Sequence, residues 1–324
     1  MSNKEIKFRF GWGNPHFLLD ILQDKMPFLE YRPNLSDMIY GPYEGTPELI
    51  KATHQVIEQT TGQVYNHILI TNGASSAINL LLRRFKTNGG SVVHTTPYGY
   101  PSYEDMIKRA GLTRVRQLNP HPQLAVGPSG LRLNLIDSPE NPTGKQHTIG
   151  DKNEDIWDGV YHNTIYTLKT KLQPSHKYFV GSYSKLLGLA GCRIGFIATN
   201  DPLAYEALLA ESRNELTGIS RPSQEMITNI LSHLDLFDFM GRGNIDLGYN
   251  KEEFQKIEYI FDSQPVNSNG MFYCVKAHDS AINLLDKVGV EYVRLDEETI
   301  RLSMGQTKLV TKSGISAILK EDKR

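Results

Sequence analysis

Short apolar runs alternate with helical patterns between residues 67 and 198, and this alternation most constrains how the chain can fold. It is typical of an α/β protein with a mostly parallel central sheet flanked by helices. The predicted strands are 67–71, 91–95, 131–137, 156–160, 178–182 and 193–198, and the predicted helices are 74–85 and 103–110. Because ligands of such sheets gather at the carboxyl ends of the strands, functional side chains are expected there.

The C-terminal third has a different pattern. A helical stretch runs from Pro202 to about Leu236, and Gly241 indicates a break before a charged helix over 246–261. Short strands are predicted at 271–276 and 299–304, with a helix at 280–288 between them, which favours a smaller α+β domain. The expected division is an N-terminal segment 1–35 packing with the small domain, a large domain 36–205, and connecting helices with the small domain over 206–324.

Composition excludes several classes of partner and location. The formal net charge of the 324 residues is −1 and the basic residues are spread out, so neither nucleic acid nor an anionic membrane is expected as a partner. Cys192 and Cys274 are too few for a disulfide framework and lack the spacing of a zinc site, so no metal site is predicted and a reducing cytoplasm fits best. The N-terminus has no signal-peptide core, and no apolar run is long enough to span a membrane.

The segment 181–195 places Lys185 and Arg193 eight residues apart among serines and glycines. This pattern predicts an anchor for pyridoxal phosphate. Lys185 would form the Schiff base, while Ser182 and Arg193 would hold the phosphate, a dianion that a guanidinium binds well. The alternative is a solvated loop lysine and a surface arginine.

Two further strand ends carry suitable groups. The turn from Gly73 through Ala74 to Ser75 precedes a helix, whose N-terminus favours a phosphate, although a plain turn with a serine cap has the same pattern. After the next strand, the segment 97–103 holds three tyrosines, one of which can stack on a flat pyridine ring. Tyrosine clusters also serve ordinary packing.

The strand ends near residues 137 and 158 supply the remaining chemistry. Asn141 lies in Ser138-Pro-Glu-Asn-Pro-Thr-Gly144, where two prolines stiffen the turn that presents its amide. The segment Asp158-Gly-Val-Tyr161 begins seventeen residues after Asn141. A carboxylate beside a pyridine nitrogen keeps the nitrogen protonated, and the amide and the hydroxyl can donate to the phenolic oxygen of the ring.

Together these motifs resemble those of class I/II aminotransferases, pyridoxal-phosphate enzymes of the aspartate aminotransferase fold, and are most similar to the alliinase and tryptophan aminotransferase branch. The motifs that carry the resemblance are 182–185 with Arg193, 141–144 and 158–161. Further matching segments are 11–15, 161–167, 216–224 and 300–303. The resemblance spans residues 8–305 and implies fold type I, with a large cofactor-binding domain and a smaller α+β domain.

For the cofactor, the resemblance implies that Lys185 is both the Schiff-base residue and the proton shuttle, and that Asp158 partners the pyridine nitrogen. Tyr161 and Asn141 would contact the phenolic oxygen. The implied phosphate ligands are Gly73, Ala74, Ser75, Ser182 and Arg193.

For the substrates, an amino acid and an α-keto acid, the resemblance implies contacts from Gly13, Asn141 and Arg301. Arg301 would bind the α-carboxylate, which suits a planar guanidinium. Tyr40 would reach the phosphate of the neighbouring subunit, so a homodimer is the expected active form.

The chain departs from the family pattern in three ways. The loop 97–100 holds one residue more than usual, so either Tyr98 or Tyr100 stacks on the ring, and counting back from Gly111 favours Tyr100. Ala74 offers no side-chain contact to phosphate. The chain is shorter than most relatives and lacks the cysteine-rich module of secreted plant alliinases.

The implied reaction is transamination of an L-amino acid, for which the branch favours aromatic side chains. One alternative is a C–S lyase, which uses Lys185, Asp158 and Arg301 for β-elimination. Another is a scaffold that binds the cofactor or a partner protein without turnover, although retention of these same three residues argues against it.

Overall fold

The computed structural model describes residues 5–24, 32, 35–118, 131–147, 155–167, 176–216, 218–262 and 269–323. Within these residues, seven strands form the larger sheet in the order β1-β7-β6-β5-β4-β2-β3. These strands are β1 (His67–Thr71), β2 (Val92–Thr95), β3 (Thr113–Val115), β4 (Leu133–Asp137), β5 (Ile156–Asp158), β6 (Tyr178–Ser182) and β7 (Gly195–Thr199). β2 to β6 pair in parallel and β7 is antiparallel to both of its neighbours. The predicted mostly parallel sheet is therefore confirmed.

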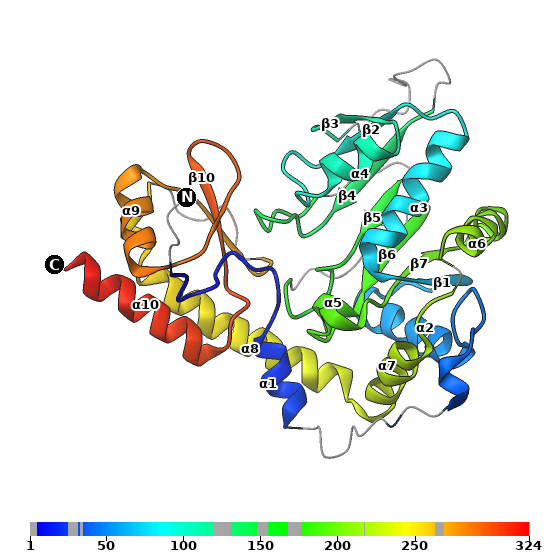
Figure 1. The fold of residues 1–324 in the computed structure, drawn as a ribbon, viewed down its shortest axis with the longest axis horizontal. Helices are drawn as coiled ribbons and strands as arrows, with labels where there is room; N and C mark the ends of the chain where they lie inside the picture. The colour runs from blue at the N-terminus through cyan, green and yellow to red at the C-terminus, as the bar shows by residue number, and fades with distance from the viewer. Residues whose placement is uncertain are drawn as a thin grey trace.

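Helices cover both faces of this sheet (Figure 1). The helices of the larger lobe are α2 (Pro47–Thr61), α3 (Gly73–Thr87), α4 (Tyr103–Arg109), α5 (Tyr183–Leu186), α6 (Pro202–Leu216) and α7 (Arg221–His233), with short 3₁₀ turns η2 (Leu35–Met38) and η3 (Ala190–Cys192). One apolar cluster lies between the sheet and α3, α4 and α6. A second occupies the other face and continues into the smaller lobe. The sheet is thus buried on both sides, as its nearly unbroken apolar strands require.

The smaller lobe contains an antiparallel sheet in the order β8-β10-β9 within the described residues. Its elements are β8 (Phe272–Lys276), α9 (Asp279–Val288), β9 (Val293–Arg294), β10 (Thr299–Ser303) and α10 (Lys308–Asp322), preceded by η4 (Glu258–Ile260). N-terminal residues join this lobe, since Phe8 bridges to Val290. α1 (Phe17–Gln23) then packs on α8 (Leu236–Gln255), which runs below both lobes in Figure 1.

The predicted helix break at Gly241 is wrong, because α8 runs without interruption from Leu236 to Gln255. Leu236, Phe239 and Leu247 bury one face of the helix, and this packing outweighs the cost of about 1 kcal/mol for a glycine in a helix. Gly243 has a packing reason, since a Cβ there would lie 2.8 Å from a methyl group of Leu18 on α1.

The helical stretch predicted from Pro202 to Leu236 is two helices, α6 and α7. The second starts where the Ser220 hydroxyl accepts a hydrogen bond from the Ser223 N–H and Pro222 occupies the first turn. α6 packs against β1, β7 and α3. Since residue 205 lies inside α6, we propose that the large domain extends through this helix.

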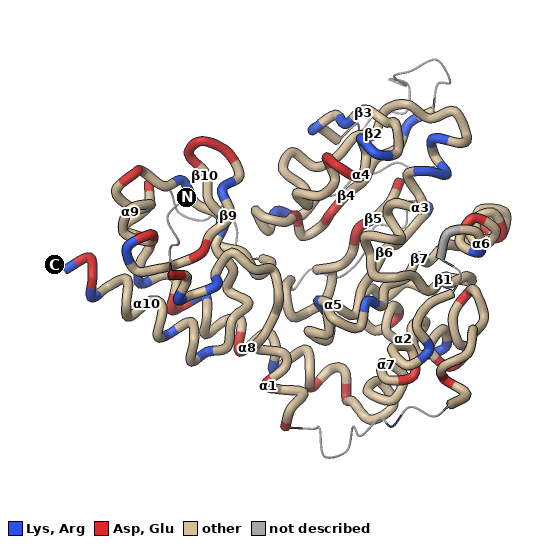
Figure 2. The backbone as a smooth tube through the Cα atoms, viewed as in Figure 1, with Lys and Arg blue, Asp and Glu red and all other residues tan. Residues whose placement is uncertain are grey.

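Positions of basic and acidic residues are interspersed along the backbone of both lobes (Figure 2). In the described part of the chain, no helix is long and apolar enough to cross a membrane.

Candidate active site

A cavity of about 380 Å³ lies at the carboxyl ends of the central strands, between the larger sheet and β8–β10 of the smaller one. Every predicted site residue lines it except Gly73 and Tyr40. The predicted residues on its wall are Gly13, Ala74, Ser75, Tyr100, Asn141, Asp158, Tyr161, Ser182, Lys185, Arg193 and Arg301. Neighbouring strand ends of the larger sheet bring most of these residues together, and contacts of the N-terminal segment with β10 add Gly13 and Arg301, almost 290 residues apart.

Lys185 lies in the short helix α5, directly after β6. The Ser182 hydroxyl caps this helix by accepting a hydrogen bond from Ser184 N–H at 3.1 Å, and it donates to the Ile194 carbonyl at 3.2 Å. The Lys185 amine enters the cavity and donates to the Gly13 carbonyl at 2.7 Å. Burial, followed by the charges of Arg193 and Arg301, lowers the pKa of Lys185 to about 8. A substantial share of this amine is therefore neutral near physiological pH.

Arg193 lies across from the N-terminus of α3. It has a left-handed backbone, with φ at 55°, and its guanidinium donates to the Ala190 carbonyl at 3.1 Å. Gly73 lies behind this guanidinium, where a Cβ would be only 2.7 Å from Nη2, so glycine leaves the space the arginine needs. Gly195 allows a similar approach, since a Cβ there would lie 2.5 Å from the Gly73 carbonyl carbon. The guanidinium is thereby held beside Ala74 and Ser75 at the start of α3.

Asp158 ends β5 and faces the opposite side of the cavity. Its carboxylate accepts hydrogen bonds from the Tyr103 hydroxyl at 2.6 Å and from the Val160 N–H at 3.1 Å. Burial raises the pKa of Asp158, and these two hydrogen bonds work against that rise. A cationic group bound beside this carboxylate would favour its ionised form further.

Asp137 is a second carboxylic acid on the wall that the motifs did not single out. It lies opposite Asp158 in the β4–β5 register and accepts hydrogen bonds from the Thr96 hydroxyl and from Asn141 N–H, the latter at 3.0 Å. Burial, the charge of Glu140 and the charge of Asp158 raise the pKa of Asp137 well above its ordinary value. Burial and the two neighbouring carboxylates thus favour the protonated form of Asp137.

Arg301 comes from β10 and closes the cavity from the smaller lobe. Its guanidinium donates to Asn141 Oδ1 at 3.0 Å and to the Gly11 carbonyl at 2.9 Å, and it lies 4.3 Å from the centre of the Phe272 ring. Nε of Arg301 is buried without a hydrogen-bond partner in the described structure. A buried cationic donor of this kind is open to a carboxylate ligand.

Three aromatic residues of the described chain line the wall: Tyr161, Phe272 and Tyr100. Tyr161 meets Phe272 edge to face at 5.7 Å, and burial raises the pKa of its hydroxyl, so it remains a proton donor. Of the two tyrosines left open by the sequence, Tyr100 lines the cavity and Tyr98 does not. Tyr100 is braced by an edge-to-face contact with Tyr103 at 5.7 Å.

Tyr40 lies away from this cavity and is 87% exposed. The sequence motifs also assigned no role to Phe272 and Asp137 on the cavity wall, or to Tyr103 and Glu140 behind it. A carboxylate at a strand end was the available signal for Asp137, whereas the other three depend on tertiary contacts.

Three comparisons bear on this site. The family model for aminotransferase class I and II matches residues 33–318. The chain is 27% identical over 218 residues to the aromatic aminotransferase ISS1 of Arabidopsis thaliana, covering 59% of this chain and 53% of that protein. It is 25% identical over 194 residues to an aspartate aminotransferase of Rhizobium meliloti, covering 48% and 46%. The matched region thus spans about half the length of these curated relatives.

The fold is shared more widely. A double mutant of Thermus thermophilus aspartate aminotransferase superposes with a TM-score of 0.78, covering 99% of this chain and 92% of that chain at 17% sequence identity. Identity this low shows the fold alone.

Proposed function

Because the chain belongs to the aminotransferase class I and II family, we propose that it is a pyridoxal-phosphate-dependent aminotransferase that moves the amino group of an L-amino acid to an α-keto acid. The observation that carries this proposal is the environment of the Lys185 amine. The amine lies in the cavity with two arginines nearby, and its pKa is lowered to about 8 by burial and by those charges. A lysine needs this lowered pKa to act as a nucleophile and as a base.

The residues present fit pyridoxal phosphate. No side chain caps the first N–H groups of α3, and Arg193 lies beside them, so this helix N-terminus is suited to a phosphate. Asp158 supplies a carboxylate for the pyridine nitrogen, and the unpartnered Nε of Arg301 remains for the substrate carboxylate. When bound, the cofactor supplies an aldehyde that condenses with amines and a ring that withdraws electrons from the α-carbon.

Each side chain then has a defined task. Arg301 and Asn141 bind and orient the α-carboxylate, with the Phe272 ring supporting the guanidinium from below. This places the α-carbon near the Lys185 amine, which as a neutral base removes the α-proton and later returns it to another carbon. Tyr161 keeps its proton and donates a hydrogen bond near the reacting centre.

The test is a spectrophotometric screen of amino acids with pyruvate and 2-oxoglutarate as acceptors, using protein loaded with pyridoxal phosphate. We expect keto-acid formation that depends on the acceptor and is lost in Lys185→Ala. Full turnover by that variant would disprove the mechanism. Release of pyruvate and ammonia without an acceptor would identify a β-eliminating C–S lyase instead, and an α-proton that never exchanges in heavy water would identify a binding scaffold.

We further propose an aromatic amino acid as the donor substrate. The apolar part of the wall comes from Ile78, Val160 and Phe272, together with the ring of Tyr100. These side chains suit a flat apolar group. In the screen, phenylalanine, tyrosine or tryptophan should give a higher kcat/KM than aspartate, and the reverse order would contradict the proposal.

We propose that the active form is a homodimer. Residues 37–41 and 218–222 line a second hollow of about 620 Å³, remote from the active site. Its rim has strongly exposed apolar side chains: Leu35, Met38, Ile39 and Tyr40 are 89%, 61%, 65% and 87% exposed. An exposed apolar group of this kind favours association, which would let Tyr40 reach the phosphate site of a second copy. A monomeric mass in solution with full activity would contradict this.

The predicted cytoplasmic location remains part of the proposal. Cys192 and Cys274 are both free, and Cys274 is buried. Free thiols are consistent with a reducing compartment.

A further inference from the structure

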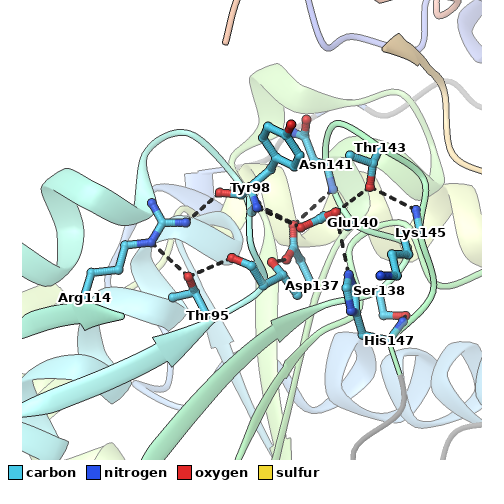
Figure 3. Close-up of polar contacts among 12 residues, drawn as sticks. Thr95, Tyr98, Arg114, Asp137, Ser138, Glu140, Asn141, Thr143, Lys145 and His147 are labelled. Atoms are coloured by element: carbon cyan, nitrogen blue, oxygen red, sulfur yellow. Dashed lines mark hydrogen bonds and ion pairs between the residues drawn. The ribbon is translucent and has the colours of Figure 1, made fainter. Parts of the chain in front are cut away.

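Glu140 is a buried carboxylate just outside the active-site cavity, and its side chain is 1% exposed. One carboxylate oxygen accepts the backbone N–H of Tyr98 at 3.0 Å and that of Gly99 at 3.3 Å. The other accepts the Thr143 hydroxyl and lies 3.6 Å from His147 Nε2. Figure 3 shows these groups converging on the carboxylate from two different loops. Glu140 therefore joins the tyrosine loop after β2 to the turn after β4.

The environment keeps Glu140 ionised. Burial alone would raise the pKa of Glu140, but His147, Thr143 and the backbone N–H of Tyr98 together hold it below its ordinary value. Hydrogen bonds to an ionised acceptor are about twice as strong as neutral ones. The loop is therefore tied to a fixed anion rather than to a neutral acceptor.

Arg114 holds the tyrosine loop from its other side. It donates to the Tyr98 carbonyl at 2.6 Å and to the Thr95 hydroxyl at 2.9 Å, as Figure 3 shows. Tyr98 is thus held at both its backbone N–H and its backbone carbonyl. Gly99 has φ at +65°, so the chain turns sharply after this residue.

The contacts of Glu140 and Arg114 with the loop constrain where its two tyrosines, Tyr98 and Tyr100, can lie. Tyr100 lies on the cavity wall, where a pyridine ring would stack. Tyr98 is directed elsewhere: burial raises the pKa of its hydroxyl, and a hydrogen bond to the Thr299 side chain of β10 works against that rise. The extra residue of this loop therefore separates a ring-facing tyrosine from one that contacts the strand that carries Arg301.

Glu140 also precedes Asn141, whose side chain accepts from Arg301 and whose N–H donates to Asp137. We propose that Glu140 is a positioning residue that fixes Tyr100 and Asn141 together against the bound cofactor and substrate. This role rests on the function proposed above. Glu140 does not line the cavity, so it acts through the groups it holds.

The experiment compares Glu140→Ala and Glu140→Gln with the matched control Asp155→Ala. Asp155 is also buried, and it accepts hydrogen bonds from the Asn134 N–H at 3.3 Å and from the Asn134 side-chain amide at 2.9 Å. It lies just before the amino end of β5, whereas Asp158 is at the carboxyl end of that strand. Five quantities are measured: amide hydrogen exchange in residues 96–103 without cofactor, the Kd for pyridoxal phosphate, KM and kcat for the amino acid, and the midpoint of thermal unfolding.

In Glu140→Ala we expect amide exchange of the loop to accelerate about tenfold or more, and the Kd for the cofactor and the KM for the amino acid to rise by about the same factor. Glu140→Gln keeps a neutral oxygen acceptor for the two N–H groups and should recover about half of this loss, because hydrogen bonds to the ionised carboxylate are about twice as strong. Asp155→Ala should lower the midpoint of thermal unfolding while leaving loop exchange, Kd and KM near the wild-type values.

Unchanged loop exchange in Glu140→Ala would overturn the proposal, and so would faster exchange with unchanged Kd and KM. If Asp155→Ala changed loop exchange, Kd and KM as much as Glu140→Ala does, the effect would be general destabilisation, and the proposal would also be overturned. If Glu140→Ala does not fold, Glu140→Asp retains the charge but is too short to hold both N–H groups, and the same outcomes apply to it. A wild-type protein that binds no pyridoxal phosphate would refute the proposed function, whereas the exchange data would still decide whether Glu140 anchors the loop.

Discussion

Replacing Tyr103 by phenylalanine removes one hydroxyl from a fully buried ring and deprives Asp158 of the hydrogen bond that it accepts at 2.6 Å. A hydrogen bond to a charged group contributes about 1.5–3 kcal/mol. Because this hydrogen bond favours the ionised form, the pKa of Asp158, already raised by burial, should rise further when the hydroxyl is removed.

The sign of the pH dependence follows from this rise. At a pH below the ordinary value of 3.8, Asp158 is protonated in both the folded and the unfolded chain, so the lost hydroxyl matters least. Above 3.8 the unfolded chain releases the proton while the folded chain retains it, so the free energy of unfolding falls until the pH passes the folded pKa. Because Tyr103→Phe raises that folded pKa, the variant should lose more stability than the wild type as pH rises.

The assay is urea unfolding of cofactor-free protein at about pH 5 and about pH 8. Tyr183→Phe is the matched control, because Tyr183 is also fully buried but its hydroxyl pairs with the neutral Thr53 hydroxyl at 2.8 Å. Its substitution should cost about 0.5–1.5 kcal/mol at both pH values. Equal losses at both pH values in Tyr103→Phe, or the same pH dependence in the control, would refute a role of Tyr103 in stabilising ionised Asp158.

Three further predictions concern the anchor, the phosphate site and α8. Covalent capture of pyridoxal by cofactor-free protein should increase with pH around a midpoint near 8, since the neutral Lys185 amine is the nucleophile; a midpoint at the ordinary lysine value of 10.5 would contradict this. Gly195→Ala places a Cβ 2.5 Å from the Gly73 carbonyl carbon, so it should destabilise the fold by about 1–3 kcal/mol and weaken cofactor binding, as thermal melts and titration would show. Gly241→Ala has no atom within 4 Å of its new methyl group and should stabilise α8 by about 0.5–1 kcal/mol in urea unfolding; a loss of stability there would contradict the packing described.

The sheet was predictable from sequence because its strands are buried on both faces and therefore appear as nearly continuous apolar runs. β1 and β6 have the predicted limits, and β4, β5 and β7 differ from them by about two residues. The prediction failed at Gly241, because local propensity disfavours a helix there and only the packing of α8 on α1 and α10 maintains it. The motif analysis did not anticipate α2 and α10.

The candidate site was predictable where a functional side chain directly follows a strand. Asp158, Lys185 and Asn141 obey this rule, so their meeting in one cavity follows from parallel pairing alone. Tyr103 and Phe272 do not, because each reaches the site through a tertiary contact that no spacing reveals. The roles assigned to these residues remain proposals for the experiments above.

Three carboxylic acids lie within two neighbouring strand ends, and their surroundings give them different charges. Glu140 receives several donors, and its pKa falls below the ordinary value. Burial, followed by that negative charge, raises the pKa of Asp137 on the cavity wall well above its ordinary value. At Asp158, burial raises the pKa, while hydrogen bonds from Tyr103 and Val160 work against that rise. Glu140, which lies outside the cavity, therefore favours the protonated form of an acid on the cavity wall through its charge.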